Sequence, residues 1–287
     1  MDAQQRAVNT VARRDKRIPV RSVAPCIFCG RFGDKSKEHI WSDWMAKLFP
    51  AEGIPSHHEV LHVHTRKSVH VSSTVLTRQG AAITKKLRVV CRACNHGWMK
   101  AVDEAVRPIL TPLIKGEPIV LNRDQQRMLA EWISLKMMVA EHNVPTEVVV
   151  RQADRDRFFA DRTIPSYFRI WVISSNSEKW RSRYIRHNAT FGLPGTPMPT
   201  AKRNTQTIAW GVGRLFIFVA MTTADGLELT DFFGVHPVVL KLFPYVGNVL
   251  PLPFLKLIDD ASGDRLAGTL EELIQSPRVI YKDTPNG

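Results

Sequence analysis

Residues 91–100 read CRACNHGWMK and place two cysteines, an asparagine, a histidine and a tryptophan close together. The Cys-x-x-Cys spacing of Cys91 and Cys94 lets one tight turn present two thiolates to a single metal ion. The chain has four cysteines, and the other two, Cys26 and Cys29, form a second pair of the same kind. Two such pairs supply the ligand set of a tetrahedral structural zinc site. We therefore predict that all four cysteines bind one Zn2+ ion; the alternative is two unrelated turns or redox pairs.

The two cysteine pairs are separated by 61 residues, more than the roughly 15–20 residues of a compact zinc ribbon. Something is therefore inserted between them. Strict alternation of apolar and polar residues over 58–75 predicts a β-hairpin, and residues 87–90 predict a short strand that leads into the second pair. A helix should begin at or just after Asn95 and end before Pro108.

The first cysteine pair is followed by the dipeptide Glu38–His39. A carboxylate is an oxygen ligand for a hard cation, and an imidazole can act as a base near neutral pH. Asn95, directly after the last cysteine, offers a neutral oxygen ligand at the start of a helix. An isolated Glu-His pair is ordinarily a solvated surface feature. Because zinc would bring both motifs together, we predict that Glu38, His39 and Asn95 form one site.

The order CxxC, EHI, VCxxCN resembles the HNH (ββα-metal, His-Me finger) endonucleases in the version that carries a four-cysteine zinc. The resemblance covers about residues 23–140. It implies a hydrolase, a nuclease in which His39 is the general base that activates water. It also implies that Glu38 and Asn95 hold a catalytic Mg2+ or Mn2+ ion and that the phosphodiester bonds of DNA are cut to leave 5′-phosphate and 3′-hydroxyl ends.

Two residues depart from the family pattern. Lys86 stands where the family has the middle asparagine that orients the histidine, so another group must hold His39. The order Asn95-His96 stands where many relatives have His-Asn, so His96 is the alternative metal ligand. We favour Asn95 because it adjoins the zinc ligand Cys94, and the next residue on a helix points elsewhere.

These patterns predict an α+β protein in three parts. Residues 1–22 form a basic N-terminal arm, residues 23–118 a zinc-stabilised ββα-metal (HNH) domain, and residues 119–287 a β-rich α+β domain of unknown role that opens with an amphipathic helix over 123–142. Within the last part we expect strands at 146–150, 167–174, 205–221 and 278–281, and a basic loop or short helix at 174–188. Self-association or a protein partner through this domain stays open.

The net charge of +13 is unevenly distributed. Residues 1–118 hold 20 Lys and Arg against 10 Asp and Glu, whereas residues 119–287 hold 20 against 17. A basic N-terminal part favours an anionic partner, and we expect nucleic acid, foremost duplex DNA. Two other functions fit the same residues. One is a zinc-dependent nucleic-acid-binding module without catalysis. The other is a ribonuclease on the same fold, since no residue of the motif is known to recognise the 2′-hydroxyl that distinguishes RNA from DNA.

No apolar run approaches the roughly 18–20 residues that a membrane span needs, and the first residues lack the apolar segment of a secretory signal. We therefore expect no membrane association and a cytoplasmic location. The resemblance implies a bacterial or phage protein.

Overall fold

The computed structural model describes residues 24–48, 59–67, 70–78, 85–191, 203–224, 240–245, 247–252 and 257–275. The expected basic arm over 1–22 and the expected strand over 278–281 lie outside these residues. The strands of the described part are β1 Lys35–His39, β2 Glu59–Lys67, β3 His70–Arg78, β4 Lys86–Cys91, β5 Ile119–Asn122, β6 Phe168–Ser174, β7 Tyr184–Ala189, β8 Thr205–Val212, β9 Leu215–Thr222, β10 Leu240–Phe243 and β11 Val249–Leu252. Its helices are η1 Asp43–Lys47, α1 Arg92–Cys94, η3 Asn95–Met99, α2 Lys100–Lys115, α3 Arg123–Ala140, η4 Glu141–Asn143, η5 Pro145–Glu147, α4 Gln152–Asp161 and α5 Asp260–Gln275.

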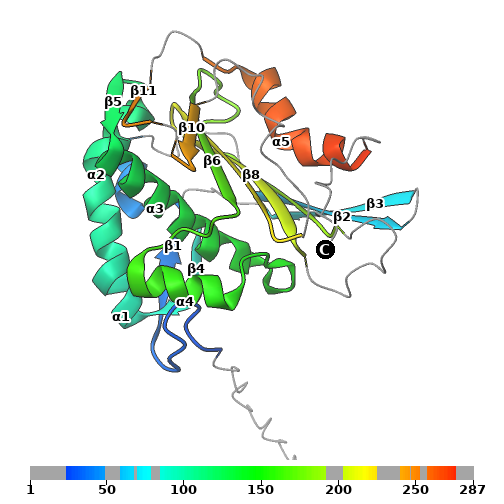
Figure 1. Cartoon of the computed structure of the whole chain (residues 1–287), viewed down its shortest axis with the longest axis horizontal. Coiled ribbons are helices and arrows are strands. Elements are labelled where there is room, and N and C mark those ends of the chain that lie inside the picture. Colours follow the sequence, from blue (N-terminus) through cyan, green and yellow to red (C-terminus); the bar gives the residue numbers. More distant parts are fainter. Residues whose placement is uncertain are drawn as a thin grey trace, which may run out of the picture.

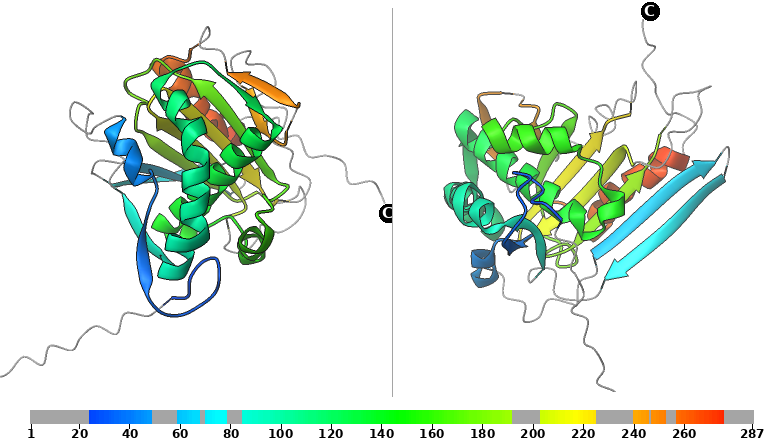
Figure 2. Two further views of the ribbon diagram at one scale, coloured as in Figure 1. Left: turned by 90° about the vertical axis from the view of Figure 1, so that its left-hand side faces the viewer. Right: turned by 90° about the horizontal axis from the view of Figure 1, so that it is seen from below.

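The centre of the molecule is a seven-stranded sheet with the strand order β10-β6-β9-β8-β7-β2-β3. Neighbouring strands run antiparallel except β2 and β7, which are parallel. Helices α3 and α4 lie on one side of this sheet and α5 on the other (Figures 1 and 2). The expectation of an α+β protein is therefore confirmed.

Side chains on successive sheet positions point to opposite faces, and this divides the core in two. One face packs with α2, α3 and the cysteine-bearing segments, and its strand residues include Ile170, Val172, Ile208, Trp210, Ile217 and Val219. The other face packs with α5, and its residues include Trp171, Ile173, Ala209, Phe216 and Phe218, against Leu266, Ala267 and Leu270 of the helix. Strands β6, β8 and β9 are covered on both faces, which explains why β6 and β9 read as nearly continuous apolar runs.

A smaller unit of two strands and a helix carries the cysteines. Strand β1 pairs antiparallel with β4, and the chain then runs through α1 and η3 into α2. Gly97 takes a non-helical conformation within η3, so the helical path is kinked there. The order of elements in this unit is therefore strand, strand, helix.

Helix α2 is longer than the sequence predicted, because it continues through Pro108 and Pro112 to a left-handed Gly116. A proline in a helix interior removes a hydrogen bond and costs on the order of 3 kcal/mol. The apolar face continues past Pro108, however, and buries Ile109 and Leu113 in the core. That burial offsets the cost, and the predicted end before Pro108 was wrong.

Helix α3 agrees with the predicted amphipathic helix. Asn122 accepts from the N–H of Gln125, and the Gln125 side chain accepts from the N–H of Asn122, which is a complete capping box. The cap fixes where the helix begins, and residues from Leu129 onward bury most of its surface.

Two predictions in the C-terminal part were wrong. Residues 146–150 form no strand; the N–H groups of Val149 and Val150 instead donate to the buried carboxylate of Glu141. Residues Tyr184–Ala189, taken for part of a basic loop or helix, form the fully buried strand β7. The charge of Arg186 was misleading, because its guanidinium is buried and donates to the main-chain carbonyl of Glu141.

The expected boundary between residues 118 and 119 does not divide the sheet or the core. The predicted hairpin exists as β2 and β3, but β2 extends the central sheet by pairing with β7. One hydrophobic cluster also runs from the cysteine turn through α2 and α3 to the sheet. The cysteine-bearing unit is therefore built onto the larger α+β body.

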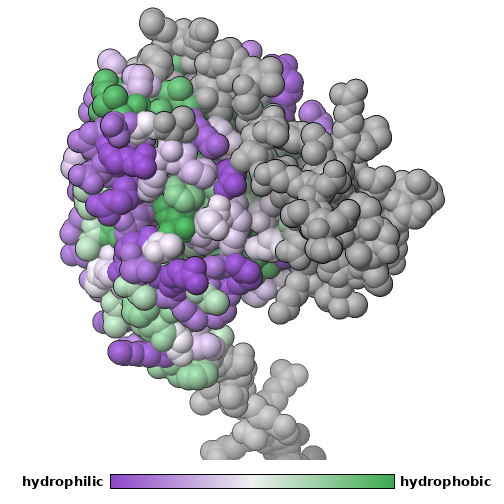
Figure 3. All heavy atoms as spheres, in the orientation of Figure 1, coloured by the Kyte–Doolittle hydropathy of each residue, from purple (hydrophilic) through white to green (hydrophobic). Residues whose placement is uncertain are grey.

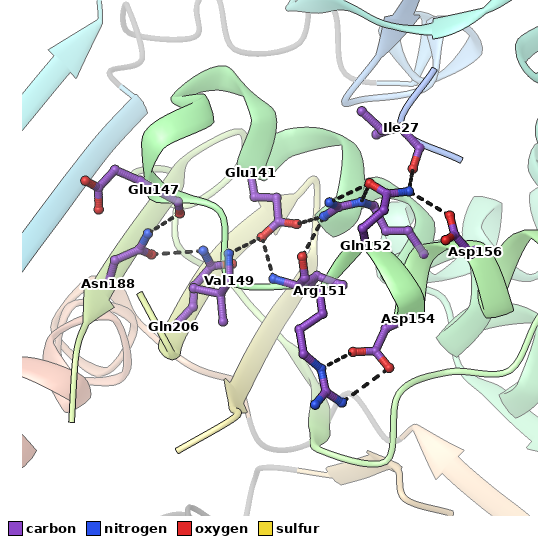
Figure 4. Close-up of polar contacts among 12 residues, drawn as sticks. Ile27, Glu141, Glu147, Val149, Arg151, Gln152, Asp154, Asp156, Asn188 and Gln206 are labelled. Atoms are coloured by element: carbon purple, nitrogen blue, oxygen red, sulfur yellow. Dashed lines mark hydrogen bonds and ion pairs between the residues drawn. The ribbon is translucent and has the colours of Figure 1, made fainter. Parts of the chain in front are cut away.

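A polar network fastens that body to the first cysteine turn. The buried carboxylate of Glu141 accepts from the N–H of Val149 at 3.0 Å and from the guanidinium of Arg155 at 3.1 Å (Figure 4). One turn away on α4, the side-chain amide of Gln152 donates to the carbonyl of Ile27 at 2.9 Å. Ile27 lies between the first two cysteines, so α4 holds that turn in place.

Among the described residues, no helix is long and apolar enough to cross a membrane.

Candidate functional site

The four cysteines gather at the junction of the first turn, β4 and α1. Their Sγ atoms all lie within 4.8 Å of one another, and those of Cys29 and Cys91 are 3.6 Å apart. Gly30 takes a positive φ of 67° and closes the first turn by donating its N–H to the carbonyl of Cys26. In the part of the chain that the structure describes, this is the one group of three or more His, Cys, Asp or Glu side chains placed to hold a metal ion.

The cysteine geometry suits a zinc ion. With Zn–S bonds of about 2.3 Å, tetrahedral coordination places neighbouring sulfurs roughly 3.8 Å apart, close to the separation of Cys29 and Cys91. Burial raises the pKa of the Cys94 thiol, so a cation is needed to make a thiolate there. The four cysteines could therefore hold zinc, as the sequence predicted.

The paired strands bring the other predicted residues beside this cluster. Lys35 of β1 lies opposite Cys91, and His39 at the end of β1 lies opposite Lys86, with an irregularity in register before Glu38. The side-chain amide of Asn95 donates to the hydroxyl of Ser36 at 2.9 Å and to the carbonyl of Lys37 at 3.2 Å. Asn95 therefore holds the strand that carries Glu38 and His39, and its Oδ1 is left to accept or to bind a cation.

The imidazole of His39 is 22% exposed, and its Nε2 lies 3.3 Å from the Oδ1 of Asp43. Burial and the Lys86 ammonium lower the pKa of His39 below its ordinary value, while the Asp43 carboxylate acts in the opposite direction. The ring is therefore neutral at pH 7 and able to take up a proton. No side-chain amide stands at the place of Lys86; the carboxylate of Asp43 is the group beside the ring.

The carboxylate of Glu38 is buried and paired with a lysine from α3. The ammonium of Lys136 lies 2.6 Å from Oε1 of Glu38, 3.1 Å from the main-chain carbonyl of His39 and 3.5 Å from Oδ1 of Asp103. Asp103 also accepts from the indole N–H of Trp132 at 2.9 Å and from the hydroxyl of Ser42. These two acids and one base carry a net charge of −1.

One surface pocket of about 580 Å³ lies between β1, η1 and α2, and its lining includes Glu38, His39, Asp43, Asp103 and Lys136. Both Asn95, half-buried, and His96, exposed, line it. Four further cations surround it: Lys37, Lys47, Lys100 and Arg107. The guanidinium of Arg107 lies 5.2 Å from the ring centre of Trp44. Hydrophilic residues are frequent along the left-hand side of the molecule in Figure 3, where Figure 1 places α2.

Sequence reasoning missed three residues of this site: Asp43, Asp103 and Lys136. A signal for Lys136 was present, because it lies among apolar residues on the buried stripe of α3 and a buried ammonium needs acidic partners. Nothing in the sequence pointed to Asp103, which looks like an ordinary polar position in the first turn of α2.

No protein-family model, curated protein or solved structure matches this chain.

Proposed function

We propose that this protein is a metal-dependent endonuclease of the HNH kind that hydrolyses phosphodiester bonds of DNA, built around a structural zinc at Cys26, Cys29, Cys91 and Cys94. One observation carries the proposal: the half-buried His39 lies in a pocket with Asn95, acidic side chains and a rim of cations, beside four clustered cysteines. A module that only binds nucleic acid would have no use for such a base.

His39 takes the proton of the attacking water in this proposal. Oδ1 of Asp43 lies 3.3 Å from Nε2 without forming a hydrogen bond, so this contact does not fix which ring nitrogen carries the hydrogen. The ring nitrogen that lacks a hydrogen carries the lone pair that accepts the proton. A neutral imidazole of lowered pKa is ready for this task at pH 7.

Glu38 and Asn95 are the residues that would hold a catalytic Mg2+ or Mn2+ ion. Carboxylate and amide oxygens are ligands that these hard cations accept, and the net charge of −1 around Lys136 favours a cation even though Glu38 is already paired. When bound, the metal supplies charge neutralisation at the scissile phosphate and the leaving oxygen. The chain's own part is to orient Asn95 through Ser36 and to hold the Glu38 side chain in place through Lys136.

Substitutions of pocket residues can test which side chains bind the catalytic metal ion and which only lie near it. We expect Asn95→Ala and Glu38→Gln to cleave poorly at low metal and to recover partly at high Mn2+, because each lowers metal affinity. Glu38→Gln keeps the side-chain size and a hydrogen-bond acceptor for the buried Lys136. His96→Ala is the matched control and should retain most activity across the same Mg2+ and Mn2+ titrations. An inactive His96→Ala with an active Asn95→Ala would transfer the ligand role to His96.

The cations around the pocket would bind the phosphate backbone. Removing one cation that pairs with a phosphate should reduce the slope of log affinity against log salt by about one. We therefore expect Lys47→Ala and Lys100→Ala to weaken duplex binding and to flatten its salt dependence, measured by fluorescence anisotropy at salt concentrations from about 50 to about 200 mM. The control is Lys115→Ala, which removes a half-exposed cation near the C-terminal end of the same helix α2, outside the pocket lining. Equal effects at Lys47, Lys100 and Lys115 would indicate that DNA responds to the overall positive charge of the protein and not to specific phosphate contacts at the pocket.

The deciding experiment incubates the purified protein with supercoiled plasmid, a labelled linear duplex and single-stranded RNA, with Mg2+, Mn2+ or a chelator. Metal-dependent cuts in DNA that leave 5′-phosphates are the expected result. Cleavage of RNA alone would make the protein a ribonuclease. Binding without any cleavage would favour the zinc-dependent binding module.

A further inference from the structure

Lys136 has an unusual position for a lysine. It lies on α3, outside the segment that carries the cysteines and His39, and its side chain is only 3% exposed. An ammonium has three hydrogens to donate, and three oxygens surround this one: Oε1 of Glu38, the carbonyl of His39 and Oδ1 of Asp103. The ammonium donates hydrogen bonds to the first two oxygens and forms an ion pair with the third.

These partners hold the chain on both sides of His39. Glu38 precedes it, the carbonyl belongs to His39 itself, and Asp103 accepts from Ser42 and from the indole of Trp44 further along. The segment from residue 38 to residue 44 is therefore held by the buried ammonium of Lys136, directly at Glu38 and His39 and through Asp103 at Ser42 and Trp44.

The local main chain gives His39 less support. The register of β1 against β4 is irregular between Ser36 and Glu38, and His39 is the last residue of β1. Beyond it, the N–H of Ile40 donates to the carbonyl of Lys85 before the chain turns into η1. A residue at the end of an irregular strand depends on tertiary contacts for its position.

We propose that Lys136 is the positioning residue for His39, so that the larger α+β body sets the place of the catalytic base. The inference rests on the proposed function for its catalytic meaning. Its geometric content, that Lys136 restrains the segment around His39, is independent of any reaction. A shift of about 1 Å at a reacting group can cost on the order of 10²-fold in rate.

The experiment compares Lys136→Met with Met138→Ala, a second buried position of α3 that is absent from the network of Glu38 and Asp103. Both variants remove buried interactions and should lower thermal stability. The first readout is the single-turnover cleavage rate alongside the dissociation constant for DNA. The second is the rate at which diethyl pyrocarbonate modifies His39, relative to the exposed His96, measured by mass spectrometry.

We expect Lys136→Met to cleave about 10²-fold more slowly with DNA affinity nearly unchanged, and to raise the modification of His39 relative to His96. Met138→Ala should leave both readouts at parental values. Equal effects in the two variants, or no effect in Lys136→Met, would overturn the proposal. If the parent cleaves no substrate, the proposed function fails, and the modification ratio still decides whether Lys136 restrains His39.

Should Lys136→Met not fold, Asp103→Asn provides the second variant, since it keeps the side-chain size and one oxygen acceptor while removing a charge that faces Lys136. Slower cleavage together with higher modification of His39 would support the proposal. Parental values of both would contradict it.

Discussion

His39→Ala should lose cleavage by a factor on the order of 10² to 10⁴ while retaining its fold, zinc content and DNA affinity. The fold should survive because Lys136 binds the main-chain carbonyl of residue 39, which alanine keeps, and the imidazole faces the 85% exposed Asp43. Single-turnover rates on the best DNA substrate measure the loss. In the parent, the acid limb of the pH profile should fall below the ordinary histidine value of about 6.5, because burial and Lys86 lower the pKa of His39.

His96→Ala is the matched control for this prediction, since it removes an imidazole from the same pocket. Circular dichroism, zinc content and binding anisotropy should be alike in both variants. If His39→Ala cuts as fast as the parent on DNA and on RNA, the nuclease proposal is lost and a zinc-built binding module becomes the better description.

Two local features of this protein follow from short segments of its sequence. Two Cys-x-x-Cys pairs predicted the cysteine cluster, because each turn fixes its own two side chains before the fold brings the turns together. The capping box at Asn122 likewise needs only four consecutive residues to define the start of α3. The residue types and their spacing within one short segment were sufficient for these features.

The remaining features depend on contacts between distant segments. Lys136 and Glu38 are 98 positions apart, and no local pattern predicts that they meet. Strand β7 was missed because Arg186 reads as exposed, although a carbonyl of Glu141 accepts from it in the interior. The hairpin of β2 and β3 was predicted correctly, yet its parallel pairing with β7 joins segments that sequence reasoning had assigned to separate domains.

Because the cysteine-bearing unit is joined to the larger α+β body, the expected effects of losing the cysteine site can be stated in detail. We expect one zinc per chain by elemental analysis, and we expect Cys91→Ser to contain no zinc, to become protease-sensitive around β1, β4 and α1, and to lose cleavage. Structural zinc contributes apparent binding free energy of about 10–16 kcal/mol, as large as the whole stability of a typical domain, about 5–15 kcal/mol. The order of Glu38, His39 and Asn95 depends on this segment, because β1 is held by β4 and by Asn95 beside Cys94.

Arg92→Ala is the control for the zinc prediction, since Arg92 lies between Cys91 and Cys94, is exposed, and has a 3.9 Å surface ion pair with Asp34 of small energetic value. It should keep zinc, protease resistance and activity. A chelator should reproduce the Cys91→Ser phenotype in the parent, and added zinc should reverse it there but not in Cys91→Ser. A parent without zinc, or a Cys91→Ser protein that is folded and fully active, would contradict the prediction of a structural zinc ion. The short distances between the four sulfurs would then require another explanation.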